Sequence, residues 1–440
     1  MSSVLSVVVL VAVLSIFIGI FLARKSRSAA LLFAGIAAPL FLMTGFLLWP
    51  VVFPGPGQAI AEQEPSTAQA TVAERDPQTA PPKISQATFE SRRPIEVESD
   101  GYVSADVCAE CHKENHASWF ASYHRTMTQV ATPEAVIGDF DDRYVSFGAH
   151  GYHLTQQGEM FWAQLSPNHV AIAPDATELP IVMTTGSHHM QVYWFPSGKS
   201  RVLGQLPIVY LKETNQWAPR NACFIQPPGS PPSLEFTRWN SVCSRCHSTH
   251  PKQRMEGKLE WDTNVAEFGI SCEACHGPAE NHIEYHRNLE SNRTGPDPIV
   301  NPNDLDHRLS SQVCGQCHSI NVHLSDETLD EGDTYIPGMS LDVSRHVHQR
   351  NQESARHLKS RSDKDPEQFF KSRFWSDGPV RVSGREYNGL IESPCFKQGE
   401  LSCLSCHAMH QDEDDPRDPC LLYTSPSPRD QRGSRMPSSA

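Results

Sequence analysis

The stretch GISCEACHGPAENHIEYH, residues 269–286, fits three kinds of cysteine site. Cys272 and Cys275 stand three positions apart, and two histidines follow at helical spacing, a pattern that suits tetrahedral zinc. In an oxidising compartment the same two cysteines could instead form a disulfide. His276 comes directly after the second cysteine and completes C-x-x-C-H, the attachment signature of c-type haem. The rest of the chain has to decide between these interpretations.

The same motif occurs five times. The chain has 13 cysteines and 21 histidines in 440 residues, and chance predicts on the order of 0.02 such motifs from that composition. The five are CAECH (108–112), CSRCH (243–247), CEACH (272–276), CGQCH (314–318) and CLSCH (403–407). Neither zinc nor a disulfide requires a histidine after every cysteine pair, so the repetition favours haem.

The motif spacing has a chemical reason. Two cysteines on one local turn can form thioethers to the two haem vinyl groups, and the adjacent histidine supplies the proximal iron ligand. The predicted cofactor is therefore haem c, in at least five copies. The predicted thioether residues are Cys108, Cys111, Cys243, Cys246, Cys272, Cys275, Cys314, Cys317, Cys403 and Cys406. The predicted proximal ligands are His112, His247, His276, His318 and His407.

The second axial ligand decides what each haem does. A histidine there gives a low potential, a methionine raises it, and an open position permits chemistry on a substrate. The candidate distal ligands are His124, His188, His189, His250, His282 and His410. A histidine three or four residues from a proximal one cannot easily reach around its own porphyrin. We therefore expect His250 and His410, like His116, to serve a neighbouring haem if they are ligands.

Local patterns narrow this list further. His124 and Met127 lie at i and i+3 on an expected helix, so one of them can face a haem. His188 and His189 lie beside a strand-like run, where neighbours point to opposite faces, so one of the two is expected to ligate. His282 is preferred over the second histidine on its helical face, His286. Weaker candidates are His323, His346 and His348.

The N-terminal residues 1–53 predict two transmembrane helices. Residues 4–22 and 29–53 are apolar and long enough to cross a bilayer. The loop between them carries Arg24, Lys25 and Arg27 and should face the cytoplasm, so that both ends of the hairpin face outward. An alternative treats residues 24–61 as a secretory signal that ends at a small-residue cleavage site.

The remaining chain divides by composition. Residues 54–100 are rich in Pro, Ala, Gln, Glu and Thr and predict a disordered linker. Residues 101–418 hold the haem motifs, and within them residues 131–242 alternate polar and apolar side chains, which predicts a β-rich insertion. The haem-bearing parts predict short helices and loops. Residues 326–395 are polar with Gly and Pro breaks and predict loops with little regular structure.

Three cysteines and the end of the chain stand apart from the motifs. Cys223 and Cys395 could pair in an oxidising compartment or remain free and buried. Residues 420–440, which include Cys420, look like translated sequencing-adapter sequence, so we expect a non-native tail there. A natural disordered tail is the alternative.

With these residues in view, the chain resembles the multihaem c-type cytochromes. It is most similar to the group that contains the tetrahaem cytochrome partner of hydroxylamine oxidoreductase. The matching stretches are VCAECHKENHASWFASYHRTM, GSHHMQ, RWNSVCSRCHSTH, GISCEACHGPAENH, VCGQCHS and SPCFKQGELSCLSCHAMH. The resemblance implies closely packed haems, most of them with two histidine ligands. Under it, His124, one of His188 and His189, and His282 are distal ligands.

The expected fold class is thus a multihaem cytochrome c, mainly short helices and loops around haems with a β-rich insertion, after an N-terminal transmembrane helical hairpin. The formal charge of −14 argues against a nucleic-acid partner. We expect a cytochrome anchored in the cytoplasmic membrane that faces the periplasm and carries electrons between redox partner proteins of a respiratory chain.

The alternative is a multihaem oxidoreductase that acts on a small nitrogen or sulfur compound at an open haem. The electron carrier is favoured, no catalytic residue is predicted, and the oligomeric state is left open. No C-x-x-C-K motif occurs, which argues against a pentahaem nitrite reductase. A zinc-binding interaction module is a third hypothesis.

Overall fold

A computed structural model describes most of the chain after residue 85. The described residues are 86–148, 150–166, 178–197, 200–223, 236–258, 260–287, 295–325, 330–361 and 365–410. Within them, no helix has the length and apolar character needed to cross a membrane. The predicted transmembrane segments in residues 1–53 and the predicted non-native tail at 420–440 lie outside the described residues.

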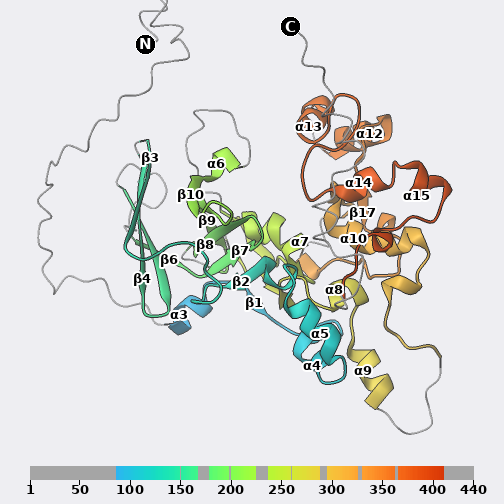
Figure 1. Cartoon of the computed structure of the whole chain (residues 1–440), viewed down its shortest axis with the longest axis horizontal. Helices are drawn as coiled ribbons and strands as arrows, with labels where there is room; N and C mark the ends of the chain where they lie inside the picture. The colour runs from blue at the N-terminus through green and yellow to red at the C-terminus, as the bar shows by residue number, and fades with distance from the viewer. Residues whose placement is uncertain are drawn as a thin grey trace, which may run out of the picture. The chain divides into compact units, whose positions relative to one another are not determined.

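Two antiparallel sheets form the β-rich part of the molecule (Figure 1). One has the order β3-β4-β5-β6 and the other β10-β9-β8-β7-β2. Their strands are β2 (Thr128–Val130), β3 (Arg143–Phe147), β4 (His150–Gln157), β5 (Met160–Leu165), β6 (Glu178–Ile181), β7 (Met183–Thr185), β8 (Met190–Pro196), β9 (Leu203–Leu211) and β10 (Gln216–Pro219). All but β2 lie inside the segment 131–242 for which β-structure is predicted.

A hydrophobic core fills the space between the two sheets. Side chains of one strand alternate between its two faces, so every second residue reaches this core. The buried members are Phe140, Tyr152, Leu154, Phe161, Ala163, Leu179, Ile181, Tyr193, Phe195, Leu206, Ile208 and Tyr210. This core needs no cofactor to close it.

The five-stranded sheet is also covered on its second face. Val192 and Trp194 of β8 belong to another buried cluster, together with Trp239, Phe268 and Phe89. Strands β8 and β9 are consequently buried along almost their whole length, as expected for strands with both faces covered. The sheet therefore supports the segment just before the second motif, where Trp239 lies.

The predicted linker is too long at its C-terminal end. Residues from 86 onward belong to the folded part: α3 (Gln86–Glu90) is followed by β1 (Ile95–Glu96), which pairs in parallel with Asn264 and Val265. Phe89 supplies the reason, since it is buried and packs edge-on against Trp162. The composition of this segment is polar on average and therefore does not reveal that one buried phenylalanine attaches it to the fold.

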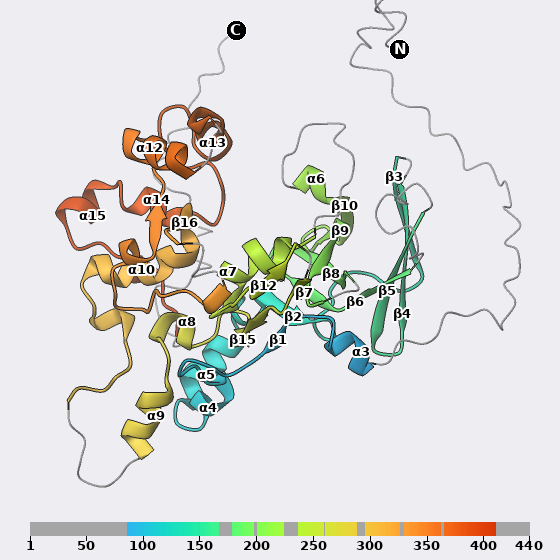
Figure 2. The same cartoon turned by 180° about the vertical axis from the view of Figure 1, so that it is seen from behind.

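Short helices and two-stranded sheets make up the rest. The helices are α4 (Ala105–Ala109), α5 (Lys113–Phe120), α6 (Arg220–Cys223), α7 (Ser244–His247), α8 (Glu273–His276), α9 (Glu280–Arg287), α10 (His307–His318), α12 (Gln352–Arg361), α13 (Pro366–Arg373), α14 (Glu386–Leu390) and α15 (Pro394–Gln398), with the single turns η2 (Arg125–Met127), η4 (Trp239–Cys243), η5 (Pro302–Asp304), η6 (Leu341–Val343) and η7 (Cys403–Ser405). The strands are β11 (Ser248–Thr249), β12 (Met255–Gly257), β13 (Glu260–Trp261), β14 (Asn264–Val265), β15 (Glu267–Phe268), β16 (Asn321–His323) and β17 (Arg345–Val347). Helix α10 contacts α14, as Figure 2 shows.

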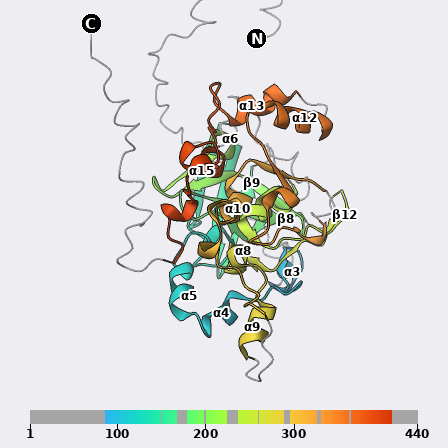
Figure 3. The same cartoon turned by 90° about the vertical axis from the view of Figure 1, so that its right-hand side faces the viewer.

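Residues 326–395 are more regular than their composition predicts. They contain α12, α13 and α14, and α12 and α13 lie side by side (Figure 3). The Asp365 side chain caps α13 and Pro366 opens its first turn. Phe370 and Phe374 then bury against Ile320. A few well-spaced aromatic residues therefore order a segment that is polar on average.

Candidate functional site

Each C-x-x-C-H motif lies on or beside one short helical turn. The first spans the junction of α4 and α5, the second joins η4 to α7, the third begins at α8, the fourth closes α10, and the fifth includes η7. Helix α10 is the longest of these supports. Its N-terminus is capped by Asp306, whose carboxylate accepts hydrogen bonds from the backbone of Arg308 (2.9 Å) and Leu309 (3.3 Å).

Cysteine contacts connect the first motif to the third and the fourth to the second. The thiols of Cys108 and Cys272 lie within interaction distance of each other. The thiols of Cys246 and Cys317 form a second such pair. Each of these thiols is a predicted attachment point for a vinyl group, so the attached haems of linked motifs would have neighbouring edges.

Two further contacts complete the connection. The thiols of Cys314 and Cys403 join the fourth motif to the fifth. The side-chain amide of Gln316 donates to the carbonyl oxygen of Ala274 at 2.8 Å, which joins the fourth motif to the third. All five motifs are therefore connected, with the fourth at the centre.

Three motif histidines face a histidine from a distant part of the chain. The ring centres of His112 and His282 are 6.2 Å apart, those of His276 and His410 are 6.2 Å apart, and those of His318 and His124 are 6.5 Å apart. A metal–imidazole bond of about 2 Å on each side of one ion, plus about 1 Å from nitrogen to ring centre, separates two opposed imidazoles by about 6 Å. The three spacings fit an iron between each pair.

Hydrogen bonds fix the outer nitrogen of three of these rings. Nδ1 of His282 lies 2.6 Å from a carboxylate oxygen of Asp297, and Nδ1 of His276 lies 2.7 Å from the carbonyl oxygen of Val300. Nδ1 of His318 lies 3.2 Å from the Glu386 carboxylate. Such partners fix the orientation and tautomer of a metal-ligating imidazole and direct Nε2 at the metal.

The electrostatics suit neutral imidazole ligands. Burial, with a smaller contribution from the charge of His318, lowers the pKa of His124 to about 4. Burial also lowers the pKa of His276. The hydrogen bond from His318 lowers the pKa of Glu386 to about 2, so this carboxylate is charged at neutral pH. Metal ligation requires deprotonated imidazole nitrogen, which these environments supply.

A close backbone approach positions His124. The backbone N–H of Ile270 donates to the His124 carbonyl at 2.9 Å, and the Trp119 indole donates to the Ile270 carbonyl at 2.8 Å. Gly269 lies in between with a φ of 76°, and a side chain there would collide with the carbonyl oxygen of Arg125. Gly269 and Ile270, the first two residues of GISCEACH, therefore have a packing role.

The helix expected around His124 and Met127 is wrong. Helix α5 ends at Phe120, and a single 3-10 turn follows instead, with His124 directly before η2 and Met127 as its last residue. The chain leaves α5 because residues 128–130 must enter the five-stranded sheet as β2. His124 is nevertheless the residue that faces a motif histidine, and the contact to His318 comes from the turn.

His188 and His189 do not occupy opposite faces of a strand. Both lie in the connection between β7 and β8, and their rings stack at 3.9 Å. His188 also stacks on Tyr123 at 4.2 Å, and His189 pairs with Glu213 at 3.1 Å. Among the described residues, neither forms a ring contact with a motif histidine.

His250 and His286 also have other partners. Nε2 of His250 lies 2.8 Å from a carboxylate oxygen of Asp100, and its ring stacks on Tyr102 at 4.2 Å. His286 lies 2.7 Å from Asp297, on the oxygen that His282 does not use. Within the described residues His250 makes no ring contact with a motif histidine, whereas His410, the other residue expected to serve a neighbouring haem, faces His276 of a different motif.

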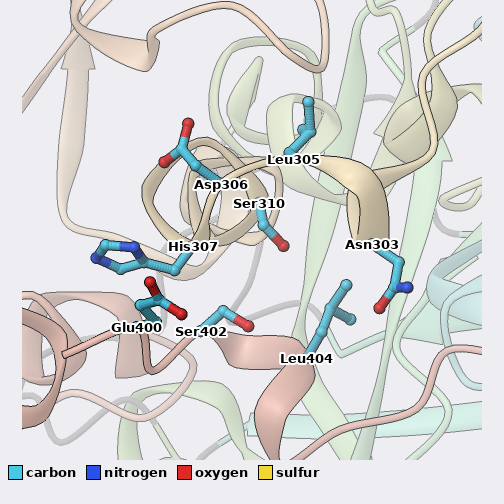
Figure 4. A pocket seen from close by; sticks show the side chains of 8 residues that line it. All are labelled: Asn303, Leu305, Asp306, His307, Ser310, Glu400, Ser402 and Leu404. Carbon is cyan, nitrogen blue, oxygen red and sulfur yellow. The ribbon is translucent and has the colours of Figure 1, made fainter.

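The fifth motif borders a pocket of about 300 Å³ (Figure 4). One wall comes from the start of α10, including His307 and Ser310, and the other from Ser402 and Leu404 near the motif. His307 was not a sequence candidate. Its Nε2 lies 3.1 Å from the carbonyl oxygen of Phe396, which ties α15 to α10 beside this motif.

Arginines surround the fourth motif, and sequence analysis missed them. Arg385 donates to the carbonyl of Cys317 at 2.8 Å, and Arg345, which is 4% exposed, donates to the carbonyl of Gln316 and pairs with Asp333. Cations at the last carbonyls of a helix interact favourably with its dipole. No local signal announces them, because each is far from the motif in the sequence.

Of the three cysteines outside the motifs, the two that lie among the described residues, Cys223 and Cys395, are free thiols. Cys223 packs partly against the cluster around Trp239, whereas Cys395 in α15 is exposed. Their predicted alternative, a disulfide, is not formed in the structure.

Comparison with known proteins gives a short family match. Residues 229–277 match the family model described as cytochrome c554 and c-prime, and this stretch contains the second and third motifs. No curated protein matches the chain. The match supports haem c at these motifs.

Two solved structures are similar. The crystal structure of the outer cell wall cytochrome OcwA has 18% identity and a TM-score of 0.42, covering 70% of this chain and 56% of that one. An undecaheme cytochrome from the S-layer of Carboxydothermus ferrireducens has 16% identity and a TM-score of 0.32, covering 72% of this chain and 41% of that one. The chain therefore spans less than two thirds of the length of either protein.

Proposed function

We propose that the chain is a multihaem c-type cytochrome that carries electrons between redox partner proteins. The observation that carries this proposal is the set of three histidine pairs at 6.2–6.5 Å, each with one member in a C-x-x-C-H motif. The family match over residues 229–277 supports it.

The proposed sites follow from the pairs. Five motifs attach at least five haems, with the ten motif cysteines as thioether residues and the motif histidines as proximal ligands. Three haems have His282, His410 and His124 as distal ligands, for the first, third and fourth motifs respectively. When bound, haem supplies reversible one-electron chemistry, and two histidine ligands favour a low potential.

The protein side chains orient and connect these groups. Asp297, Glu386 and the Val300 carbonyl hold three imidazoles by Nδ1, so that Nε2 is presented to the metal. The thiol contacts between motifs bring cofactor edges together, and electron tunnelling is fast only over short gaps. The fourth motif contacts the second, third and fifth motifs, so a haem attached there would have the most haem neighbours.

We further propose that the N-terminal hairpin anchors the chain in the cytoplasmic membrane with the haem domain in the periplasm, as part of a respiratory chain. Two uncharged apolar stretches with a basic loop between them support this topology. A relation to the tetrahaem partner of hydroxylamine oxidoreductase is part of the same proposal and rests on the motif-flanking residues.

The test starts from the full chain, matured with its haems. Mass spectrometry and the pyridine haemochrome assay should give at least five covalent haems per chain. Electron paramagnetic resonance should show mainly low-spin iron, and His282→Gln should convert about one low-spin haem per chain to high-spin.

His250→Gln is the matched control, because His250 pairs with Asp100 instead of a motif histidine. An equal loss of low-spin haem in both variants would refute the proposed ligand assignment. Steady turnover of nitrite or hydroxylamine by the isolated protein would instead favour a multihaem oxidoreductase with an open haem.

A further inference from the structure

Three histidines outside the haem motifs form a separate cluster. They are His346, His348 and His357. The ring centre of His346 lies 4.8 Å from that of His348 and 4.2 Å from that of His357, and the ring centres of His348 and His357 lie 5.3 Å apart. One ring nitrogen from each lies within 4.8 Å of the nitrogens of the other two. None of the three faces a motif histidine in a ring contact within the described residues.

The local structure explains how they meet. His346 lies in β17 and His348 follows it at i+2, so both side chains leave the extended chain on the same side. Helix α12 supplies His357. The backbone of His348 is fixed at both ends, since its N–H donates to the Ile320 carbonyl at 2.7 Å and its carbonyl accepts from Asn388 at 2.7 Å.

Four of the six ring nitrogens of this cluster are buried without hydrogen-bond partners. They are Nε2 of His346, both nitrogens of His348 and Nδ1 of His357. His348 is fully buried. Buried polar atoms without hydrogen-bond partners are destabilising, so four of them in one place indicate that a partner belongs between them.

All three ring spacings are shorter than a haem iron between two opposed imidazoles requires. Opposed haem ligands need ring centres about 6 Å apart, as in the three pairs described above, whereas His346 and His357 stack at 4.2 Å with 21° between their planes. Three ligands on the same side of one ion have nitrogens about 3.3 Å apart in tetrahedral geometry. The three nitrogens lie within 4.8 Å of one another, so a closure of at most about 1.5 Å per pair reaches the tetrahedral spacing.

Two arginines lie near the cluster, Arg373 close to His348 and Arg361 close to His357. Their positive charges oppose a bare divalent ion and favour hydroxide or another anion as its fourth ligand.

We propose that His346, His348 and His357 bind one divalent transition-metal ion, with zinc as its probe, and leave the fourth position to water or an anion. Three imidazoles form the ligand set of a zinc site with an open position, and imidazole also suits copper and nickel. His346 and His357 are only partly buried, so the ion can enter from their side. This site is independent of the haem ligation proposed above.

The experiment uses the full chain with its haems in place. The protein is equilibrated with zinc, dialysed against metal-free buffer, and analysed for zinc and iron. We expect about one zinc per chain, with about three nitrogen ligands near 2.0 Å at the zinc absorption edge. His346→Gln and His357→Gln should each lose this zinc and keep the iron content.

Two further variants make the result decisive. His357→Cys keeps a zinc ligand and should retain the ion, which separates ligation from a folding defect. His153→Gln removes a histidine that pairs with Asp142 and stacks on Tyr144, and it should change nothing. Unchanged zinc in His346→Gln and His357→Gln would overturn the proposal. So would the loss of one low-spin haem in these variants, because the histidines would then ligate a haem.

Discussion

The two-sheet part and the haem-motif part of this chain are stabilised in different ways. The sheets enclose a core of twelve buried residues, nearly all large and apolar. The haem-motif part has a small apolar cluster around Ile320, and its motifs meet through thiols, imidazoles and hydrogen-bonded polar groups. A cofactor-binding region leaves room for the cofactor to serve as its core, so its stability depends on that cofactor.

The first prediction has the largest expected effect and tests whether the stability of the haem-motif part depends on its cofactor. Replacing Cys314 and Cys317 together with Ser removes the attachment of the central motif, which touches the second, third and fifth. We expect at least one haem to be lost and the helices around α10 to unfold, while the strands remain. Haem content and far-ultraviolet circular dichroism measure both.

Cys223→Ser is the control for that double variant, since Cys223 is a thiol outside the motifs. It should keep every haem. Retention of the full helical signal in the Cys314/Cys317 variant would show that the haem region folds without its central cofactor.

The second prediction concerns the sheets alone. Leu206→Ala leaves a cavity at a fully buried position between the sheets. It should lower the free energy of unfolding by about 2–5 kcal/mol. The haem absorption spectrum should not change. Denaturant unfolding followed by tryptophan fluorescence tests this. The control is Tyr144→Ser, at a position that is 71% exposed, which should change the free energy of unfolding by less than about 0.5 kcal/mol.

A pH effect should appear only in the haem region. Burial raises the pKa of Glu267 to about 7 and that of Glu273 to about 8. Their folded pKa values exceed the ordinary one, so their contribution is complete below about pH 4.5 and is lost as the pH rises toward 8. The stability of this region should therefore fall as the pH rises across that window.

Glu267→Gln keeps an acceptor for the Ala105 N–H, which now binds the carboxylate at 3.1 Å. The variant should flatten part of the pH profile in thermal melts between pH 5 and 8. An unchanged profile would mean that Glu267 stays ionised or protonated throughout.

The smallest effect is expected at Asp297. Its carboxylate accepts from His282, and Asp297→Asn removes a negative charge that favours ferric iron. The midpoint potential of one haem should rise by the equivalent of about 1 kcal/mol. A spectroelectrochemical titration measures this. His286→Gln, which leaves the His282 contact in place, should shift it less.

Some of this architecture was accessible from sequence and some was not. The motif cysteines and histidines follow from a local five-residue pattern, and the strands follow from alternation over residues 143–219. The partner of each motif histidine is a long-range property: His124 faces His318 only because β2 and Gly269 hold its turn in place. Composition also misled at Phe89 and Phe370, where single aromatic residues order polar segments.

The three histidine pairs have a consequence for folding. Each proposed iron joins positions separated by well over a hundred residues, from 112 to 282, 124 to 318 and 276 to 410. A cross-link over a loop of that length removes unfolded-state entropy worth about 4–5 kcal/mol in the chain-entropy model. The loops overlap, so no segment between 112 and 410 lies outside them. The irons would thus act as reversible cross-links, and reagents that displace an axial imidazole would lower the stability of the whole fold.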